Sequence, residues 1–329
     1  MFRALIIGCG KIAGLYDKGG KNSILSHAAA YRKNGRIKVA AYIDIDPARA
    51  KKLAAKYGSD SFGTSIERAV IDWRPDVVSV CTPNETHGRV MRAILESNFV
   101  PKVIFVEKPV CVDAKELAQI KGLSRRRNIR IIVNHTRRFD YTHRKMKEMI
   151  REDKFGTLVR GDIFYYGGWR HNGVHAVDTL LFLFGGPLRV KEVRGAVRAR
   201  RHDPTLEVVL SLGRKMAPVY LHPVNEKYYQ VYDLDLKFDK SRLRIENFGA
   251  RYVYAKRSVN HMNENVLVDH KIAIPMTAAS PLQNAMDTIV TFLKTGDSSA
   301  ITDYCIDNAA ETMKVIWDAE KIYEDRLKK

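Results

Sequence analysis

The stretch "GCGKIAG" at residues 8–14 decides the fold, because closely spaced glycines join an apolar run to the start of a helix. It fits the pattern G-x-G-x-x-A. In this pattern the first glycine allows a tight turn, the second lets the backbone approach a pyrophosphate, and the small third residue lets the helix pack close to the sheet. The N–H groups at the helix start then face the anion. The residues expected to contact a dinucleotide here are Gly8, Gly10, Lys11, Ile12 and Ala13.

Short strands and helices alternate around this turn over residues 1–135. The expected strands are nearly continuous apolar runs, as in strands covered on both faces. They lie at 3–8, 38–44, 77–83, 102–109 and 130–135. Helices are expected at 46–58, 84–98 and 113–128. This alternation predicts an α/β domain of the Rossmann type, a doubly wound parallel sheet with crossover helices.

The pattern changes after residue 135 and predicts a second domain over 136–329. A helix is expected at 141–156. Alternating apolar and polar residues, typical of antiparallel strands with one solvated face, follow at 157–168, 206–213, 228–239 and 242–257. We therefore expect an α+β domain with a largely antiparallel open sheet. The helices expected within 282–329, at 282–296 and 306–329, could pack against either domain.

Composition limits the classes of partner. The 329 residues contain 56 Lys and Arg against 37 Asp and Glu, a formal net charge of +19. The basic clusters at 124–130 and 197–202 lack the interleaved aromatic residues of a nucleic-acid stacking platform. Nucleic-acid binding is therefore not expected, and the charge is better explained by a solvated surface or by attraction of an anionic small molecule.

Targeting segments are not evident in the sequence. The N-terminal stretch lacks a signal-peptide cleavage site, and the longest apolar run, at 179–186, is too short to cross a bilayer. The cysteines form no CxxC pair, which argues against a zinc knuckle or a disulfide framework. We therefore expect a cytoplasmic location, no membrane association, and four small, buried cysteines, Cys9, Cys81, Cys111 and Cys305.

Asp44 ends the second expected strand, where a carboxylate usually binds the adenosine ribose hydroxyls. It follows Gly10 by 34 positions instead of roughly twenty. The polar, Gly-containing insertion at 15–26 accounts for the excess and is either a lid over the cofactor or an ordinary surface loop. Because a carboxylate repels a 2′-phosphate, NAD is expected in preference to NADP, although Arg49 and Lys51 leave the choice open.

Five motifs together make the chain resemble the Gfo/Idh/MocA oxidoreductases over nearly its whole length. They are "GCGKIA" (8–13), "TPNETH" (82–87), "EKP" (107–109), "RRF" (137–139) and "GVHAVD" (173–178). The resemblance implies an NAD-dependent dehydrogenase or reductase that acts on a CH–OH group. It also implies a homodimer or homotetramer formed through the open face of the second sheet.

The resemblance assigns roles to individual residues. Lys108 lies beside nicotinamide and substrate, Pro109 often follows a cis peptide, and His175 is the acid/base. A neutral imidazole suits proton removal from an alcohol, and a nearby ammonium favours the alkoxide-like state. The residues of these motifs expected to contact the cofactor are Thr82, Pro83, Asn84, His87, Glu107 and Lys108.

His171 departs from the family pattern, because relatives commonly have an aspartate four residues before the catalytic histidine. His171 could replace that aspartate as a catalytic orienter or shuttle, contact substrate, or be structural. Asn172 is expected to cap the helix, which places His171 in the preceding loop. No metal is expected, although a zinc site of His171, His175 and Asp178 is conceivable. Asp178 is expected to tie the helix to neighbouring backbone.

The substrate is expected to be sugar-like. The resemblance and the positive charge favour a nucleotide sugar or sugar phosphate, and free inositols and unmodified aldoses remain open. Aromatic and polar groups suit the CH face and hydroxyls of a sugar. Of Tyr165 and Tyr166, one is expected to be structural filler. Two alternatives remain open: an enzyme that retains NAD for epimerisation or elimination, and a non-catalytic NAD-binding sensor. The residues expected near the substrate are Arg138, Tyr166, Trp169, Arg170 and Asn172.

Overall fold

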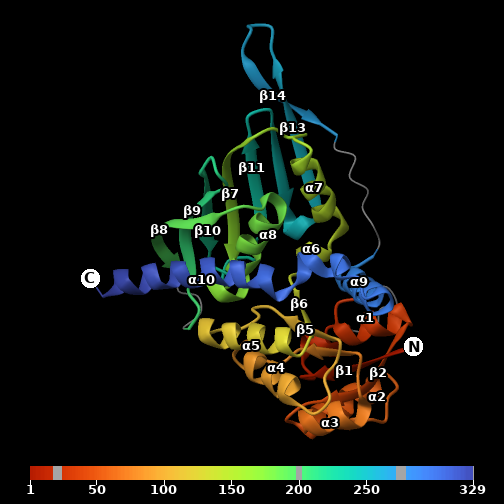
Figure 1. Cartoon of the computed structure of the whole chain (residues 1–329). Coiled ribbons are helices and arrows are strands. Elements are labelled where there is room, and N and C mark those ends of the chain that lie inside the picture. The colour runs from red at the N-terminus through yellow and green to blue at the C-terminus, as the bar shows by residue number, and fades with distance from the viewer. Residues whose placement is uncertain (18–23, 198–201, 272–278, 329) are drawn as a thin grey trace. The chain divides into compact units, whose positions relative to one another are not determined.

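The computed structural model describes residues 1–17, 24–197, 202–271 and 279–328. The chain divides into two compact units (Figure 1). The first comprises 1–140 and 277–310, and the second comprises 141–276 and 311–329. The first unit thus ends at Asp140 instead of residue 135, and it includes one of the two C-terminal helices that the sequence could not assign to a domain.

The first unit is built on a parallel sheet of strand order β3-β2-β1-β4-β5-β6. This is the doubly wound Rossmann order, in which the winding direction reverses between β1 and β4. The five predicted strands are confirmed, and β3, which has two residues, escaped prediction because it is too short to show a pattern. The strands are β1 (Phe2–Ile7), β2 (Ile37–Ile43), β3 (Phe62–Gly63), β4 (Val77–Val80), β5 (Val103–Glu107) and β6 (Arg130–Asn134).

Several helices of the first unit begin at a side-chain cap. The Ser26 side chain accepts a hydrogen bond from the Ala29 N–H, and Asp46 and Asp113 cap α2 and α5 in the same way. The predicted helix at 84–98 is divided into a 3₁₀ turn, η2, and α4. The helical elements are η1 (Lys11–Leu15), α1 (His27–Asn34), α2 (Pro47–Lys56), α3 (Ile66–Trp73), η2 (Asn84–Thr86), α4 (His87–Glu96), α5 (Ala114–Arg126), α6 (Thr136–Phe139), α9 (Pro281–Thr295) and η5 (Ser298–Tyr304).

The core of the first unit joins distant parts of the sequence. Ala4 and Ile6 of β1 share one buried cluster with Ile289 of α9, which comes from the C-terminal part of the chain. In this unit α9 also lies beside α1 (Figure 1). The apolar face of α9 therefore completes the cover of the parallel sheet.

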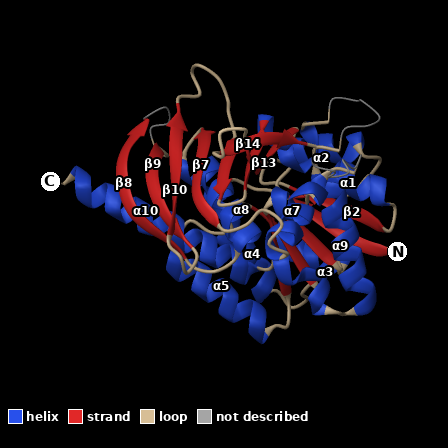
Figure 2. Cartoon of the chain, turned by 90° about the horizontal axis from the view of Figure 1, so that it is seen from above, coloured by secondary structure: helices blue, strands red, loops and turns tan. Residues whose placement is uncertain are grey.

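The second unit contains a mixed sheet of order β14-β13-β12-β11-β7-β10-β9-β8, flanked by helices (Figure 2). Among its described pairings, β7 and β10 run parallel and the others antiparallel. Its elements are α7 (Tyr141–Arg151), β7 (Leu158–Tyr166), η3 (Trp169–Gly173), α8 (Val174–Phe184), β8 (Leu188–Val197), β9 (Thr205–Leu212), β10 (Ala217–Val224), β11 (Asp233–Phe238), β12 (Ser241–Glu246), η4 (Asn247–Gly249), β13 (Arg251–Val259), β14 (Asn265–His270) and α10 (Ile306–Leu327).

Three predicted elements of this unit need correction. The helix at 141–156 ends at Arg151, and the strand at 228–239 begins only at Asp233. The stretch 242–257 forms two strands, because η4 turns the chain through the left-handed region at Asn247 and Phe248. The sequence also missed β8, β10 and β14. No described helix combines the length and apolar character that crossing a membrane requires.

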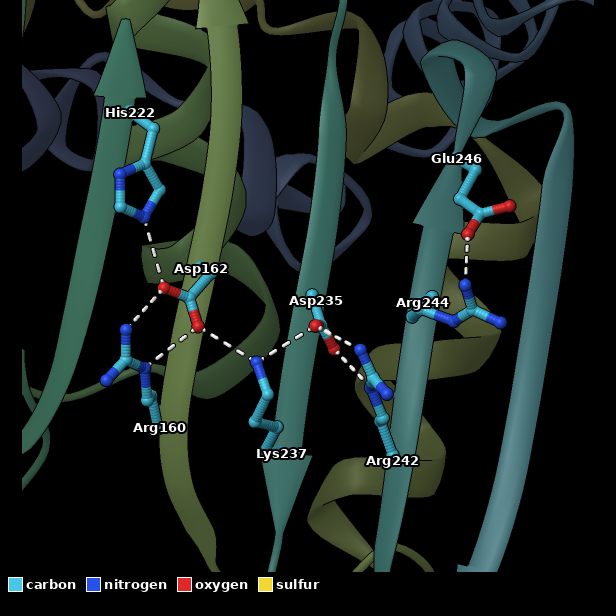
Figure 3. Close-up of polar contacts among 8 residues, drawn as sticks. All are labelled: Arg160, Asp162, His222, Asp235, Lys237, Arg242, Arg244 and Glu246. Carbon is cyan, nitrogen blue, oxygen red and sulfur yellow. Dashed lines mark hydrogen bonds and ion pairs between the residues drawn. The ribbon is translucent and has the colours of Figure 1, made fainter. Parts of the chain in front are cut away.

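Charged side chains form ion pairs within and between neighbouring strands of this sheet (Figure 3). Asp162 accepts hydrogen bonds at 2.9 Å from Arg160 and from Lys237, and Lys237 also donates to Asp235. Contact with Arg160, together with Lys237 and His222, holds the pKa of Asp162 well below its usual range. We call this set the charged face: Arg160, Asp162, His222, Asp235, Lys237, Arg242, Arg244 and Glu246.

Candidate functional site

The two glycines of the turn after β1 serve different purposes. Gly8 has φ +87°, and a Cβ there would lie 2.7 Å from backbone atoms of Cys81 and Thr82. A Cβ on Gly10 would meet nothing within 4 Å. Gly8 is therefore required by the fold, whereas Gly10 leaves open space where a pyrophosphate could approach the backbone.

The helical segment after the turn is short. η1 spans five residues and has π-type hydrogen bonding. Ala13 is fully buried, which agrees with the close packing predicted for it. Gly14 is equally constrained, because a Cβ there would lie 2.4 Å from the Leu53 side chain of α2. Small residues at both positions let this segment pack against the sheet and α2.

Asp44 lies beside the glycine turn, as the sequence predicts. Its Oδ2 accepts a 2.7 Å hydrogen bond from the Cys9 N–H, and its Oδ1 accepts one of 2.9 Å from the Asp46 N–H. An ionised carboxylate can accept about four hydrogen bonds, so acceptor capacity remains for ribose hydroxyls. The open space at Gly10 and this carboxylate together fit the adenosine half of a dinucleotide.

The insertion that lengthens the Gly10–Asp44 spacing lies between η1 and α1. Residues 18–23 of it lie outside the described residues, so the lid hypothesis stays a prediction. The described ends are joined to each other and to α2. Asp17 accepts hydrogen bonds from the Leu25 N–H and the Ser26 hydroxyl, and Lys56 donates to the carbonyls of Gly14 and Asp17.

His87 joins the loops that follow β4 and β5. Its ring is buried, and its two nitrogens lie 2.8 Å from the carbonyl oxygens of Thr82 and Pro109. The Lys108–Pro109 peptide is cis, as the resemblance implied. The buried Thr82 hydroxyl has no hydrogen-bond partner among the described residues. The structure thus gives His87 a positioning role, and direct cofactor contact by His87, Thr82, Pro83 and Asn84 stays a prediction.

Glu107 is held by two residues that the sequence analysis missed. Its Oε1 accepts hydrogen bonds from His27 Nε2 at 2.8 Å and from Asn134 Nδ2 at 2.6 Å. Burial raises the pKa of Glu107, but His27, Asn134 and the charge of Lys108 outweigh burial and the net shift is downward. Glu107 is therefore a carboxylate beside Lys108. No local sequence signal links His27 to Glu107, which lies 80 positions away.

Arg138 is buried in the first unit. Its guanidinium donates a 2.7 Å hydrogen bond to the carbonyl of Asp303 in η5, and Asn284 of α9 donates to the carbonyl of Phe139. The rings of Phe139 and Tyr304 stack at 4.2 Å. The "RRF" motif thus anchors α6 to η5 and α9, and substrate contact by Arg138 stays a prediction.

The helix that carries His171 and His175 begins earlier than predicted. Asn172 is not its cap, because its N–H already bonds to the Gly168 carbonyl inside the first turn, η3. Asp203 caps the segment instead, accepting hydrogen bonds from the N–H groups of Arg170 and His171 at 2.8 and 2.9 Å. His171 therefore lies in the helical segment and not in a loop. A cap supplied by a residue about thirty positions later has no local signature.

Residues around the two histidines fix η3 and α8 to α10. Trp169 is buried and its indole N–H donates to the Ile316 carbonyl at 3.0 Å. Arg170 forms a two-pronged ion pair with Glu320 at 2.5 and 2.8 Å. Asp178 accepts a hydrogen bond from the Thr312 hydroxyl of α10, and its predicted contact with neighbouring backbone stays a prediction. These contacts are structural, and substrate binding by Trp169, Arg170 and Asn172 stays a prediction.

Tyr165 and Tyr166 divide as predicted. Tyr165 is buried and donates to the Leu206 carbonyl, whereas Tyr166 is half-buried at the end of β7. The Tyr166 ring meets the exposed Phe248 ring edge-on, at 6.1 Å. Tyr166 is thus the member of the pair that a ligand could contact.

The predicted residues gather at strand ends in each unit. Glycines 8 and 10, Asp44, Thr82 and Lys108 follow β1, β2, β4 and β5, whose carboxyl ends share one edge of the parallel sheet. In the second unit, Tyr166 is the last residue of β7, and His171 and His175 follow it in the helical segment. Among the described residues, no three His, Cys, Asp or Glu side chains are arranged to hold a metal ion.

Comparison with known proteins agrees with this geometry. Residues 2–135 match the Gfo/Idh/MocA model, described as an oxidoreductase family with an NAD-binding Rossmann fold. Over 173 residues the chain is 28% identical to inositol 2-dehydrogenase of Rhizobium meliloti, an alignment that covers 48% of this chain and 51% of that protein. The chain spans about half the length of the curated relatives it matches.

Solved structures extend the likeness to the whole fold. A protein named as an NADPH-dependent oxidoreductase, from Desulfitobacterium hafniense, superposes with a TM-score of 0.81 at 18% identity, covering 98% of this chain and 96% of that one. UDP-N-acetylglucosamine 3-dehydrogenase from Acidithiobacillus ferrooxidans gives 0.73 at 15% identity, over 98% of each chain. The resemblance drawn from the motifs is confirmed, since residues 2–135 match the model of the Gfo/Idh/MocA oxidoreductase family.

Proposed function

We propose that the protein is an NAD-dependent oxidoreductase that transfers a hydride between nicotinamide and a secondary hydroxyl or ketone of a sugar-like substrate. The glycine turn carries this proposal, because Gly10 leaves open space beside the Asp44 carboxylate. The family match supports the reaction class. Similar proteins named as an inositol dehydrogenase and a UDP-N-acetylglucosamine dehydrogenase support a sugar-like substrate.

The choice of NAD over NADP rests on Asp44. A carboxylate beside the ribose site repels a 2′-phosphate. The nearby Arg49 lies 3.3 Å from Asp46, so its charge is already shared with an acid. A fluorescence titration should give tighter binding of NADH than of NADPH, and the reverse order would overturn this preference.

The chemistry follows from the side chains the protein supplies. When bound, NAD provides the hydride acceptor. His175 takes the proton of the substrate hydroxyl, and Lys108 polarises the same oxygen. His171 orients His175 or relays the proton. If His171 relays the proton, His171→Ala should lower kcat far more than it raises KM, whereas the opposite pattern would make it a binding residue.

The two glycines of the turn provide the test of cofactor binding. Gly10→Ala should leave the melting temperature nearly unchanged and weaken NADH binding at least tenfold, because the added methyl group lies where the pyrophosphate approaches. Gly8→Ala is the matched control and should lower the melting temperature, because the methyl group would collide with the backbone after β4. A Gly10→Ala protein that binds NADH normally would contradict the proposal.

The same preparation separates the alternatives. Mass spectrometry of the denatured protein identifies any dinucleotide or sugar nucleotide it retains. Released NAD would favour the enzyme that keeps its cofactor for epimerisation or elimination, and an empty protein that binds added NADH would favour an exchanging dehydrogenase. NADH binding without turnover of any sugar, inositol or nucleotide sugar would favour the sensor.

We further propose a homodimer or homotetramer formed through the charged face, and a reducing, cytoplasmic environment. The charged face presents both signs of charge, which suits a self-complementary contact between two copies. The four cysteines are free, and Cys9, Cys81 and Cys111 are buried. Light scattering in solution tests the assembly, and a monomer would contradict it.

A further inference from the structure

A row of polar side chains crosses the otherwise apolar core of the first unit. The Tyr31 hydroxyl lies 2.8 Å from Ser79 Oγ, and Ser79 Oγ lies 3.0 Å from His27 Nδ1. His27 Nε2 and Asn134 Nδ2 then meet Oε1 of Glu107. We call these five residues, Tyr31, Ser79, His27, Glu107 and Asn134, the buried polar network.

The donors and acceptors of this network fit one direction. Glu107 is a carboxylate and only accepts, so His27 Nε2 carries the hydrogen between them. His27 Nδ1 can then accept from the Ser79 hydroxyl, and Ser79 can accept from Tyr31. Burial raises the pKa of the Tyr31 hydroxyl, which therefore keeps its proton. Each hydrogen bond along this row therefore has one donor and one acceptor, and the row ends at Glu107.

The buried polar network lies where apolar side chains would cost less free energy to bury. Val78 and Val80 flank Ser79 in β4, Phe105 precedes Glu107 in β5, and all three are fully buried. Polar groups in such a core cost free energy unless each is paired, and replacing them with apolar residues is often neutral or stabilising. The need for a fixed carboxylate at Glu107 explains why they are present.

The network also links the two halves of the dinucleotide fold. His27 is the first residue of α1, which belongs to the half that follows the glycine turn, whereas Glu107 ends β5 in the other half. Each half of a Rossmann fold binds one mononucleotide. His27 therefore braces, from the adenosine half, the turn that the proposed function places at nicotinamide.

We propose that His27 is a positioning residue for the nicotinamide half of the cofactor. It holds the Glu107 carboxylate from behind and, together with Asn134, fixes the 107–109 turn before the dinucleotide arrives. The 12% of the Glu107 side chain that remains exposed is the part a ligand could reach. This inference rests on the proposed function, because it requires that the protein binds NADH.

The test compares two ligands that share only the adenosine half. His27→Phe keeps a ring against Phe105, 4.8 Å away in the native protein, but removes the donor to Glu107. Calorimetric titration should show NADH binding weakened about tenfold, the loss expected for one charge-assisted hydrogen bond, with ADP binding unchanged. Parallel losses for NADH and ADP, or no loss for either, would overturn the proposal.

Matched variants sharpen the test. His27→Gln can still donate an amide N–H to Glu107 and should restore most of the NADH affinity. Tyr31→Phe removes only the far end of the network and should leave both ligands bound as in the wild type. If His27→Phe does not fold, Asn134→Ala removes the other donor to the same oxygen and should show the same NADH-specific loss, and its absence would overturn the proposal.

The outcomes are distinguishable from failure of the proposed function. A wild-type protein that binds neither NADH nor ADP would contradict the proposed function itself. A wild-type protein that binds both, with a folded His27→Phe variant that binds NADH equally well, would contradict only the positioning role.

Discussion

Polar side chains form two networks of opposite character, one in each unit. In the buried polar network, Glu107 has two hydrogen-bond donors on one oxygen and lies in an apolar core. On the charged face, Asp162 has three basic partners, Arg160, Lys237 and His222, on half-exposed positions. Both carboxyl groups have a lowered pKa, because hydrogen bonds from their partners outweigh the effect of burial.

The two networks differ in how easily other groups can replace a lost partner. Loss of one partner on the charged face leaves other cations and water to serve the carboxylate, so each contact contributes little alone. Loss of His27 leaves a largely buried carboxylate with one donor fewer, so much of its desolvation penalty is no longer offset. A lowered pKa therefore does not measure how strongly the fold depends on a contact.

The largest expected difference between the two networks is in the free energy of unfolding after one partner is removed from each. We expect His27→Ala to lower the free energy of unfolding by about 3 kcal/mol, because it leaves both a cavity and an under-satisfied carboxylate. Lys237→Ala should cost less than about 1 kcal/mol, because Asp162 keeps Arg160 and His222. Differential scanning calorimetry, in which the units can melt separately, measures both. Equal losses of unfolding free energy in the two variants would contradict the proposed difference between the networks.

The dependence of stability on pH under acidic conditions tests the charged face by itself. The pKa of Asp162 is lowered from an ordinary value of 3.8, so its ionised form stabilises the fold above about pH 4, and this contribution is lost as the pH falls further. Asp162→Asn should therefore cost about 1–2 kcal/mol at pH 7.

The cost of Asp162→Asn should shrink below about pH 4, where the carboxyl group begins to be protonated in the unfolded wild-type chain while it stays ionised in the folded protein. Urea unfolding of both proteins at stepped pH values measures this. About 1 M salt, which shortens the Debye length to about 3 Å, should reduce the cost as well. A cost that depends on neither pH nor salt would mean that Asp162 acts through packing and not through charge.

The two units also differ in how far the sequence predicts them. Buried parallel strands are continuous apolar runs, and the glycine turn and Asp44 have local signatures, so the sequence predicts these features of the first unit directly. His27 and Asn134 could not, because their partner Glu107 lies far away in the sequence. Local patterns predict what a segment becomes but not which distant side chain will meet it.

In the second unit the same limit produced a wrong cap. Asn172 has the residue type and position of a cap, but Asp203, from the connection between β8 and β9, occupies that role. Two glycines, Gly167 and Gly168, precede the helical turn with positive φ, and a Cβ on Gly168 would collide with the Asp203 carboxylate. The glycine pair was the available signal that another segment approaches closely there.

The smallest expected effect on stability concerns non-glycine residues with left-handed backbone, and each unit contains an example. Arg74 ends α3 with φ 41°, whereas α1 and α9 end at Gly35 and Gly296 in the same region. Met216, between β9 and β10, has φ 57°. A non-glycine residue in the left-handed region destabilises the fold by about 1–2 kcal/mol, and replacing it with glycine removes this strain. Glycine also makes the unfolded chain more flexible, which cancels part of the gain in stability.

Arg74→Gly and Met216→Gly should therefore each raise the free energy of unfolding by about 0.5 kcal/mol. Arg74→Ala and Met216→Ala are the controls, because they remove the side chain but keep the strain. Urea unfolding resolves such a difference when the slopes agree. Stabilisation by Met216→Gly but not by Arg74→Gly would mean that the Arg74 guanidinium, 5.9 Å from the Phe99 ring, compensates the strain at the end of α3.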